Sequence, residues 1–203
     1  MNYLAIDTSG KNLTVIIKQG EKEHTFFDAD CGVNHSTALM PCVEKLIEQT
    51  GFDLKGADFF AAVVGAGSFT GIRIGVATVK ALCFAFNKPC LAITSFDTLA
   101  YNEKGGKVLA LIDAKHNGFY ACGYEDNKVI VQPAYLMRDK VEELVGEFDT
   151  VVASQSIEGF NVKVVSLSEG LKNAIDNKLK EITPDVEALT PLYVRKSQAE
   201  EGR

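Results

Sequence analysis

One sequence pattern occurs twice in this chain, and it constrains the fold more than any other feature. Residues Leu4–Gly10 form a short apolar strand that ends in an aspartate and a polar turn, and residues Val108–Gly118 do the same. Two further strand-like segments follow each copy at similar spacing. They are expected at Leu13–Ile17 and His24–Phe27 in the first copy, and at Phe119–Tyr124 and Val129–Gln132 in the second. The repetition predicts an α/β fold built by duplication.

A glycine-rich stretch, Gly65–Gly75, lies between a predicted buried strand (Phe59–Val64) and a predicted helix (Thr70–Phe86). Glycines here permit a tight turn and close approach of the backbone to another group. The stretch lacks the lysine of a Walker A loop and has the wrong spacing for a dinucleotide fingerprint. Two interpretations stay open: a turn whose glycines only allow tight packing, or a loop that contacts a nucleotide phosphate.

The predicted helix over Thr70–Phe86 is apolar nearly all round, which indicates burial on more than one side. One stripe consists of Ile72, Val76, Val79, Cys83 and Phe86. A second side carries Ile74, Ala77, Ala81, Phe84 and Ala85. One side can pack on the chain's own sheet, so we expect another molecule to cover the other side.

Composition and charge narrow the class of protein. With 203 residues, a net charge of −6 and a pI near 5.2, the chain is not expected to bind nucleic acid by itself. No membrane span or signal peptide is expected, and five cysteines without a C-x-x-C pair favour free thiols in a reducing cytoplasm. The linker Asn102–Gly106 divides the chain into predicted domains 1–101 and 107–203.

Another helix is predicted from about Thr37 to Thr50, closed by Gly51. Its apolar stripe contains Leu39, Val43, Leu46 and Ile47. His35 precedes this helix, and no second histidine lies at metal-ligand spacing. A capping or packing role is therefore expected for His35.

Taken in order along the whole chain, these motifs resemble the bacterial TsaB (YeaZ) family of tRNA threonylcarbamoyladenosine synthesis. The motifs that carry the resemblance are Asp7–Ser9, His35–Ser36 with Pro41, Gly65–Gly75, Asp113–Lys115 and Pro191–Arg195. The resemblance implies two RNase H-like halves of the actin, Hsp70 and sugar-kinase type. In that fold, mixed sheets are flanked by helices, and here the second half looks reduced.

The resemblance also implies a role without catalysis. The paralogue TsaD holds a metal with an H-x-x-x-H motif, and the matching positions here are Ser95 and Leu99. No catalytic residue and no metal ligand is therefore expected in this chain. The implied function is a non-catalytic partner and scaffold of TsaD, with a TsaE-like ATPase joining the complex. ATP and a metal ion would be used by the partner complex, and tRNA would be contacted only through it.

Family members dock through their first two helices, so the resemblance implies a partner surface on those helices. Because the second apolar side of the helix over Thr70–Phe86 would seldom stay bare on a monomer, we also expect a homodimer when the chain is alone, formed by the helices near 37–50 and 70–86. The expected partner-binding residues are Leu39, Val43, Leu46, Ile74, Ala77, Ala81 and Phe84. The groups expected nearest to any bound nucleotide are Asp7, Thr8, Ser9, Gly67 and Ser68.

Two enzymatic alternatives stay open. The first is a small ATP-dependent phosphotransferase or ATPase of the same fold, using Asp7 or Asp113 beside a phosphate. The second is a glycoprotease-like hydrolase. No Ser–His–Asp or metal constellation can be assembled for it from His24, His35 and His116.

Overall fold

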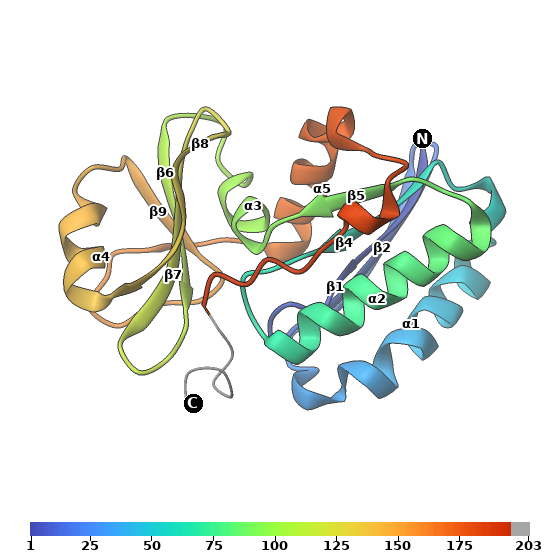
Figure 1. Ribbon diagram of the computed structural model, residues 1–203, viewed down its shortest axis with the longest axis horizontal. Helices are drawn as coiled ribbons and strands as arrows, with labels where there is room; N and C mark the ends of the chain where they lie inside the picture. The colour runs from blue at the N-terminus through green and yellow to red at the C-terminus, as the bar shows by residue number, and fades with distance from the viewer. Residues whose placement is uncertain (196–203) are drawn as a thin grey trace. The chain divides into compact units, whose positions relative to one another are not determined.

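The computed structural model describes residues 1–195, and contacts divide the chain into two compact units (Figure 1). Unit 1 contains Met1–Ile93 and Asn177–Leu192, and unit 2 contains Thr94–Asp176 together with residues 193–195. The bounds of these units differ from those of the predicted domains 1–101 and 107–203. The charged segment expected from the sequence after Arg195 lies outside the described residues.

Unit 1 is a five-stranded mixed sheet in the order β3-β2-β1-β4-β5. Strands β1, β2 and β3 are antiparallel neighbours, whereas β4 is parallel to β1 and β5 is parallel to β4. The strands are β1 (Asn2–Asp7), β2 (Leu13–Gln19), β3 (Lys22–Asp28), β4 (Phe59–Val63) and β5 (Cys90–Ile93). The helices are η1 (Gly32–Asn34), α1 (His35–Thr50), η2 (Leu54–Gly56), α2 (Phe69–Phe86), η3 (Leu179–Glu181) and η4 (Val186–Ala188).

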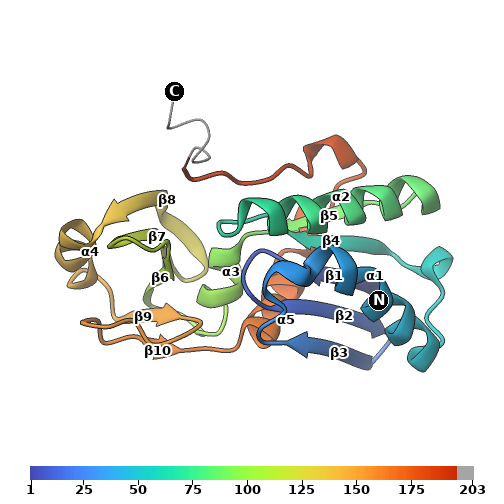
Figure 2. The same ribbon diagram turned by 90° about the horizontal axis from the view of Figure 1, so that it is seen from below.

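Helices α1 and α2 lie side by side on one face of this sheet (Figures 1 and 2). Alternation along the strands sends Leu4 and Ile6 of β1 into the same apolar core as Val43 of α1 and Val79 of α2. The ends of α2 have local causes. Ser68 caps its first turn, its hydroxyl accepting from the Gly71 amide at 3.2 Å, and Asn87 ends it in the left-handed conformation.

The core-facing stripe of α2 is the one that contains Ile72, Val76, Val79 and Cys83, all buried. By length and composition alone α2 could also cross a membrane, since its 18 residues have a mean hydropathy of 1.5. The core helix of a globular domain passes the same test. Packing of α2 on β4 and β1 accounts for its apolar character on this side.

The segment Asn177–Leu192 returns to unit 1 after the strands of unit 2. Cys90 and Thr183 exchange two backbone hydrogen bonds at 2.9 and 3.0 Å, and the Leu192 amide donates to the Val64 carbonyl at 2.7 Å. The sequence-based bounds placed this segment in the second domain. Its pairing partners lie about a hundred residues earlier, so local sequence patterns carry no sign of them.

Unit 2 repeats the topology with a sheet in the order β10-β9-β6-β7-β8. Its first three strands, β6, β7 and β8, are antiparallel neighbours, and β9 is parallel to β6 as β4 is to β1. The elements are α3 (Ser95–Ala100), β6 (Lys107–Asp113), β7 (Gly118–Glu125), β8 (Lys128–Met137), α4 (Arg138–Val145), β9 (Thr150–Ala153), β10 (Lys163–Val164) and α5 (Leu167–Asn177). The two units thus share one strand order, and the prediction of two RNase H-like halves is confirmed.

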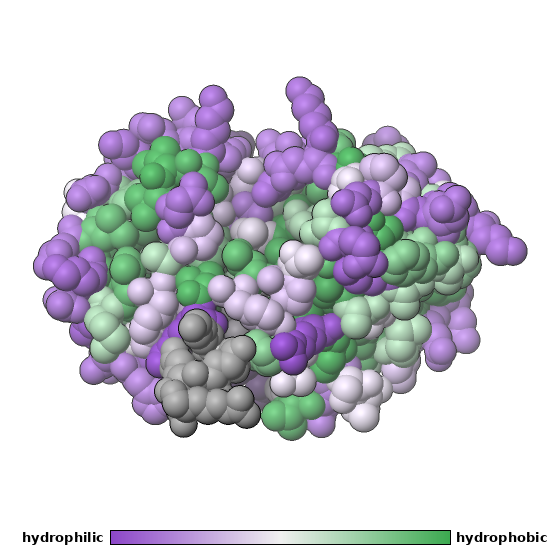
Figure 3. Space-filling view, viewed as in Figure 1, coloured by the Kyte–Doolittle hydropathy of each residue, from purple (hydrophilic) through white to green (hydrophobic). Residues whose placement is uncertain are grey.

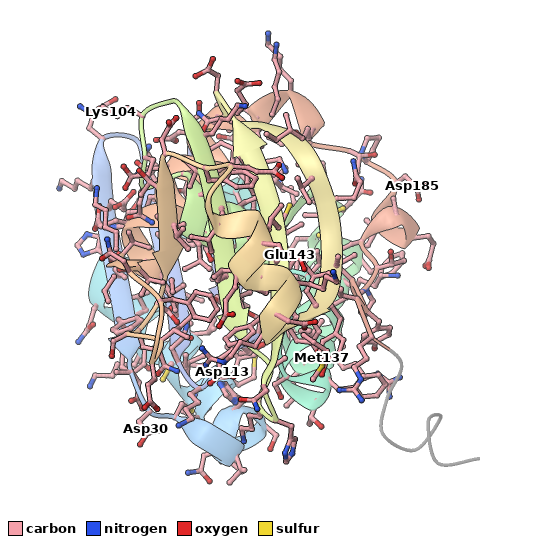
Figure 4. All side chains as sticks on the ribbon, turned by 90° about the vertical axis from the view of Figure 1, so that its left-hand side faces the viewer. Asp30, Lys104, Asp113, Met137, Glu143 and Asp185 are labelled. Carbon is pink, nitrogen blue, oxygen red and sulfur yellow. The ribbon has the colours of Figure 1, made fainter. Side chains whose placement is uncertain are left out.

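The second half is reduced, as expected. Helix α4 has 8 residues where α1 has 16, and β9 runs to the two-residue strand β10 without a counterpart of α2. Figure 4 shows α4, with Glu143 labelled, lying across the sheet. Its Val141 joins Leu109, Phe119 and Val151 in a separate apolar core. Helix α3 packs against β6, β7 and β9 of the same unit.

Candidate functional site

Two loops of unit 1 meet at the carboxyl ends of neighbouring strands. The turn after β1 begins at Asp7, and the glycine loop Gly65–Ser68 follows β4. Because β1 and β4 are parallel neighbours, both loops emerge at the same edge of the sheet. The structure therefore brings together the residues predicted to lie nearest a nucleotide.

The Asp7 carboxylate is buried, with 2% of the residue exposed, and it accepts hydrogen bonds within its own turn. One oxygen accepts from the Ser9 amide at 2.8 Å and from the Ser9 hydroxyl at 2.7 Å, and the other accepts from the Asn12 amide group at 3.3 Å. Burial raises the pKa of Asp7 above its usual range, while the Ser9 and Asn12 hydrogen bonds and nearby His35 oppose the rise.

His35 is buried at the start of α1, where its Nε2 lies 2.9 Å from the Asn12 carbonyl oxygen. This contact ties α1 to the turn after β1, which fits the predicted packing role. His24 and His116 are exposed. Within residues 1–195, no three His, Cys, Asp or Glu side chains lie close enough together to hold a metal ion.

The glycines of the second loop approach the first loop rather than an open space. A Cβ atom on Gly67 would collide with the Ser9 carbonyl oxygen, and one on Gly71 would collide with the Thr8 carbonyl oxygen. The Ser68 amide donates to the Ser9 carbonyl at 2.6 Å, and the Thr8 hydroxyl donates to the Gly71 carbonyl at 2.7 Å. Tight packing between the two loops accounts for these glycines, which is the first of the two interpretations left open by the sequence.

On α2, the residues expected to contact a partner point away from the core. Ala77, Ala81 and Phe84 are exposed, Phe84 at 62%, and Ile74 is half-buried. Figure 3 shows hydrophobic atoms over the region where α2 lies in Figure 1. We call these four residues the outer α2 face.

On α1, the three predicted partner residues lie elsewhere. Leu39, Val43 and Leu46 are 1%, 1% and 7% exposed and belong to the core of unit 1. They cannot offer surface to a partner while this unit is folded, which corrects the sequence-based assignment. The physical reason is that the apolar stripe of an amphipathic helix is the side the sheet requires. Met40, 43% exposed, is instead an outward apolar residue of α1.

A shallow groove of ≈ 680 Å³ continues from the end of α2, and sequence reasoning missed it. Phe84 and Asn87 line one side, and Pro184 and Val186 of the returning segment line the other. Lys80 of α2 and Glu187 form an ion pair at 3.1 Å beside it. No local pattern could have indicated this groove, because its two sides lie about a hundred residues apart.

Ser95 and Leu99, where the resemblance to TsaD implies that the paralogue has its histidines, lie on α3 in unit 2. Ser95 is 6% exposed and Leu99 is 1% exposed, so both are buried. Between them Asp97 forms a capping box with Thr94 and accepts a hydrogen bond from the Tyr124 hydroxyl at 3.0 Å. Burial, with the Asp97 charge in second place, raises the pKa of Tyr124 far above its usual range. The arrangement holds α3 to the sheet of unit 2.

Comparison with known proteins gives the class first. Residues 29–199 match the family model described as "TsaD: tRNA N6-adenosine threonylcarbamoyltransferase". This match and the strand order shared by the two units define the class: the chain belongs to the protein family that this model describes and has two RNase H-like halves.

More particular relatives are proteins described as "tRNA threonylcarbamoyladenosine biosynthesis protein TsaB". The Escherichia coli protein is 27% identical over 165 residues, which cover 74% of this chain and 71% of the relative. The Bacillus subtilis protein is 33% identical over 129 residues, which cover 62% of this chain and 56% of the relative. The chain belongs to the TsaB (YeaZ) family.

Solved structures agree on the fold. A Pseudomonas aeruginosa structure described as "an uncharacterized protein with similarity to peptidase YEAZ" has a TM-score of 0.77 and 23% identity, covering 96% of this chain and 99% of that one. A structure described as "YeaZ from Pseudomonas aeruginosa" has a TM-score of 0.74 and 20% identity, covering 95% and 99%. At these identities the likeness supports the fold alone.

Proposed function

We propose that this chain is a non-catalytic partner and scaffold of a TsaD-type transferase in forming threonylcarbamoyladenosine on tRNA. The observation that carries the proposal is the outer α2 face, whose four residues are apolar. The charged residues nearest to it on α2 are Arg73, one helical turn before Ala77, and Lys80, which is paired with Glu187. Apolar surface of this kind marks an interaction site when it is contiguous.

The shape of the outer α2 face suits another helix. Ala77, Ala81 and Ala85 recur every fourth residue and are exposed, so a facing helix can approach closely along this row. Phe84 is the large exposed side chain that can serve as an anchor. On α1, the helix beside α2, Met40 is also an exposed apolar residue. A pair of helices from the paralogous transferase is the partner that matches this surface.

The absence of catalysis is part of the same proposal. Ser95 and Leu99 stand where the transferase has its histidine pair, and both are packed into the interior. Asp7, Thr8 and Ser9 are buried and bonded to one another or to α2. ATP, a metal ion and tRNA are then assigned to the transferase and a TsaE-like ATPase in a cytoplasmic complex.

The test is association of the purified chain with the TsaD-type transferase of the same organism, followed by size exclusion with light scattering. We expect a complex with the wild-type chain. Ala81→Glu should leave the free energy of unfolding within about 0.5 kcal/mol. The same change should weaken binding more than about a hundredfold, because it buries an unpaired charge in the interface.

Two controls make this result specific. Val129→Glu adds the same charge at an exposed apolar position of unit 2 and should bind like the wild type. Val79→Glu adds it to the core stripe of α2, where the residue is fully buried, and should unfold the protein. Full binding by a folded Ala81→Glu variant would show that the outer α2 face is not the interface.

We further propose that the chain alone forms a homodimer through the outer α2 face. A two-fold dimer places the same apolar face on both copies and so covers it. Light scattering should show a dimer at micromolar concentrations for the wild type and a monomer for Ala81→Glu. A wild-type monomer at high micromolar concentration would contradict this part of the proposal.

The enzymatic alternative has its own measurement. Steady-state ATP hydrolysis and peptide cleavage should be absent for the isolated chain with magnesium or with zinc. Turnover that the Asp7→Ala change removes would instead establish an enzyme that uses the β1–β2 turn.

A further inference from the structure

Thr8 makes the closest contacts between the β1–β2 turn and α2. It is fully buried, and its hydroxyl donates to the Gly71 carbonyl at 2.7 Å. A Cβ atom on Gly71 would collide with the Thr8 carbonyl oxygen, and one on Gly75 would lie 2.6 Å from the Thr8 hydroxyl oxygen. The first two turns of α2 therefore rest on Thr8 with no room for a methyl group.

The two glycines are costly where they stand. Glycine inside a helix destabilises it by roughly 0.5–1 kcal/mol relative to alanine. Gly71 and Gly75 are four residues apart and so lie on one side of α2. The two glycines offset this cost by allowing α2 to approach Thr8 closely.

The outer α2 face begins on the same two turns, at Ile74 and Ala77. A helix behaves as a stiff rod over this length, so a displacement at Gly75 moves Ala81 and Phe84 as well. The distance between α2 and Thr8 thus determines the distance of the outer α2 face from the sheet of unit 1.

We propose that Thr8 is a positioning residue for partner binding: it sets the position of α2, and through α2 the geometry of the outer α2 face. This inference rests on the proposed function, in which the outer α2 face binds the transferase. In this proposal, the turn after β1 and the glycine loop after β4 set the geometry of the interface, although their buried residues would not touch the partner.

A compensating pair of substitutions tests the proposal. Gly75→Ala introduces a methyl group against the Thr8 hydroxyl, and Thr8→Ala removes that hydroxyl. Calorimetric titration with the TsaD-type transferase should show about tenfold weaker binding for Gly75→Ala, with most of the loss recovered in the double variant. Thr8→Ser keeps the hydroxyl and should bind like the wild type. All titrations are made well below the melting temperature of each variant.

A stability control separates positioning from simple destabilisation. Val79→Ala leaves a cavity in the core stripe of α2 and does not change the groups at Gly71, Gly75 and Thr8. It should lower the melting temperature at least as much as Gly75→Ala and yet bind like the wild type. Equal loss of affinity in both variants would overturn the proposal, as would wild-type affinity in a folded Gly75→Ala variant.

If Gly75→Ala does not fold, the variant Thr8→Val tests the proposal instead. Thr8→Val removes the hydrogen bond to Gly71 and puts a methyl group where the hydroxyl lies 2.7 Å from the Gly71 carbonyl, closer than a carbon atom can approach. This variant should therefore bind several-fold more weakly, and wild-type affinity in a folded Thr8→Val variant would overturn the proposal. A wild-type chain that fails to bind the transferase refutes the proposed function itself. Normal wild-type binding, its loss in Ala81→Glu and wild-type affinity in Thr8→Val and Gly75→Ala would refute only the role of Thr8.

Discussion

Asp7 and Asp113 end the first strand of the two sheets, and each accepts a hydrogen bond from the backbone amide two residues later. The distances are 2.8 Å from the Ser9 amide and 2.7 Å from the Lys115 amide. Asp7 is buried, whereas Asp113 is exposed and is labelled at one end of the sheet of unit 2 in Figure 4. The two copies of the motif therefore share the hydrogen bond within the turn but differ in the exposure of the aspartate to solvent.

Asp7 should make the free energy of unfolding depend on pH. Burial raises the pKa of Asp7 in the folded protein above its ordinary value of 3.8, so the folded state binds the proton more tightly than the unfolded state. The folded state should gain stability as pH falls through the folded pKa toward 3.8. Asp7→Asn should remove this contribution, so its stability relative to the wild type should be greatest at neutral pH and shrink on acidification.

Urea unfolding at pH 7 and pH 5 measures this difference, with Asp113→Asn as the matched control for an exposed carboxylate in the same turn. A constant difference between Asp7→Asn and the wild type at both pH values would contradict the assignment.

Much of the fold could be predicted because its signals are local. Helix α2 begins one residue before its predicted start and ends at its predicted last residue, since the apolar pattern, a serine cap and a following proline each act over a few residues. The presence of two apolar sides on α2 was also predictable. Which side faces the sheet was not, because that depends on where the helix sits against β4.

The parts that could not be predicted depend on long-range pairing. Thr183 pairs with Cys90, which lies 93 residues earlier in the chain, and the Tyr124 hydroxyl donates to Asp97, which lies 27 residues earlier. For the loop pair, the sequence indicated that Gly67 approaches something closely. Only the fold shows that the neighbour is the Ser9 carbonyl of the same chain.

Removal of the Tyr124 hydroxyl should cost stability in a pH-dependent way. Tyr124→Phe leaves the buried Asp97 oxygen without this donor, at a cost of about 1–3 kcal/mol at neutral pH. The raised pKa keeps Tyr124 neutral in the folded state, while in the unfolded state it ionises near its ordinary value of 10.0. Wild-type stability should therefore fall above pH 10 through this group, and the gap to Tyr124→Phe should narrow.

Urea unfolding at pH 7, 9 and 10.5 measures the difference in the free energy of unfolding between the wild type and Tyr124→Phe. A gap that stays constant to pH 10.5 would show that Tyr124 titrates alike in both states.

The contact between α5 and α3 in unit 2 gives the last prediction. A Cβ atom on Gly170 would collide with the Thr98 carbonyl oxygen, which belongs to the backbone and cannot rotate away. Gly170→Ala should therefore force α5 from α3 and destabilise the protein by about 1–3 kcal/mol or more. The matched control is Gly146→Ala, where no atom lies within 4 Å of the added carbon and the backbone is already right-handed. That change should stabilise by about 0.4–1 kcal/mol through the unfolded state. Thermal and urea unfolding of the two variants should move in opposite directions, and a neutral Gly170→Ala would mean that α5 does not pack on α3 as described.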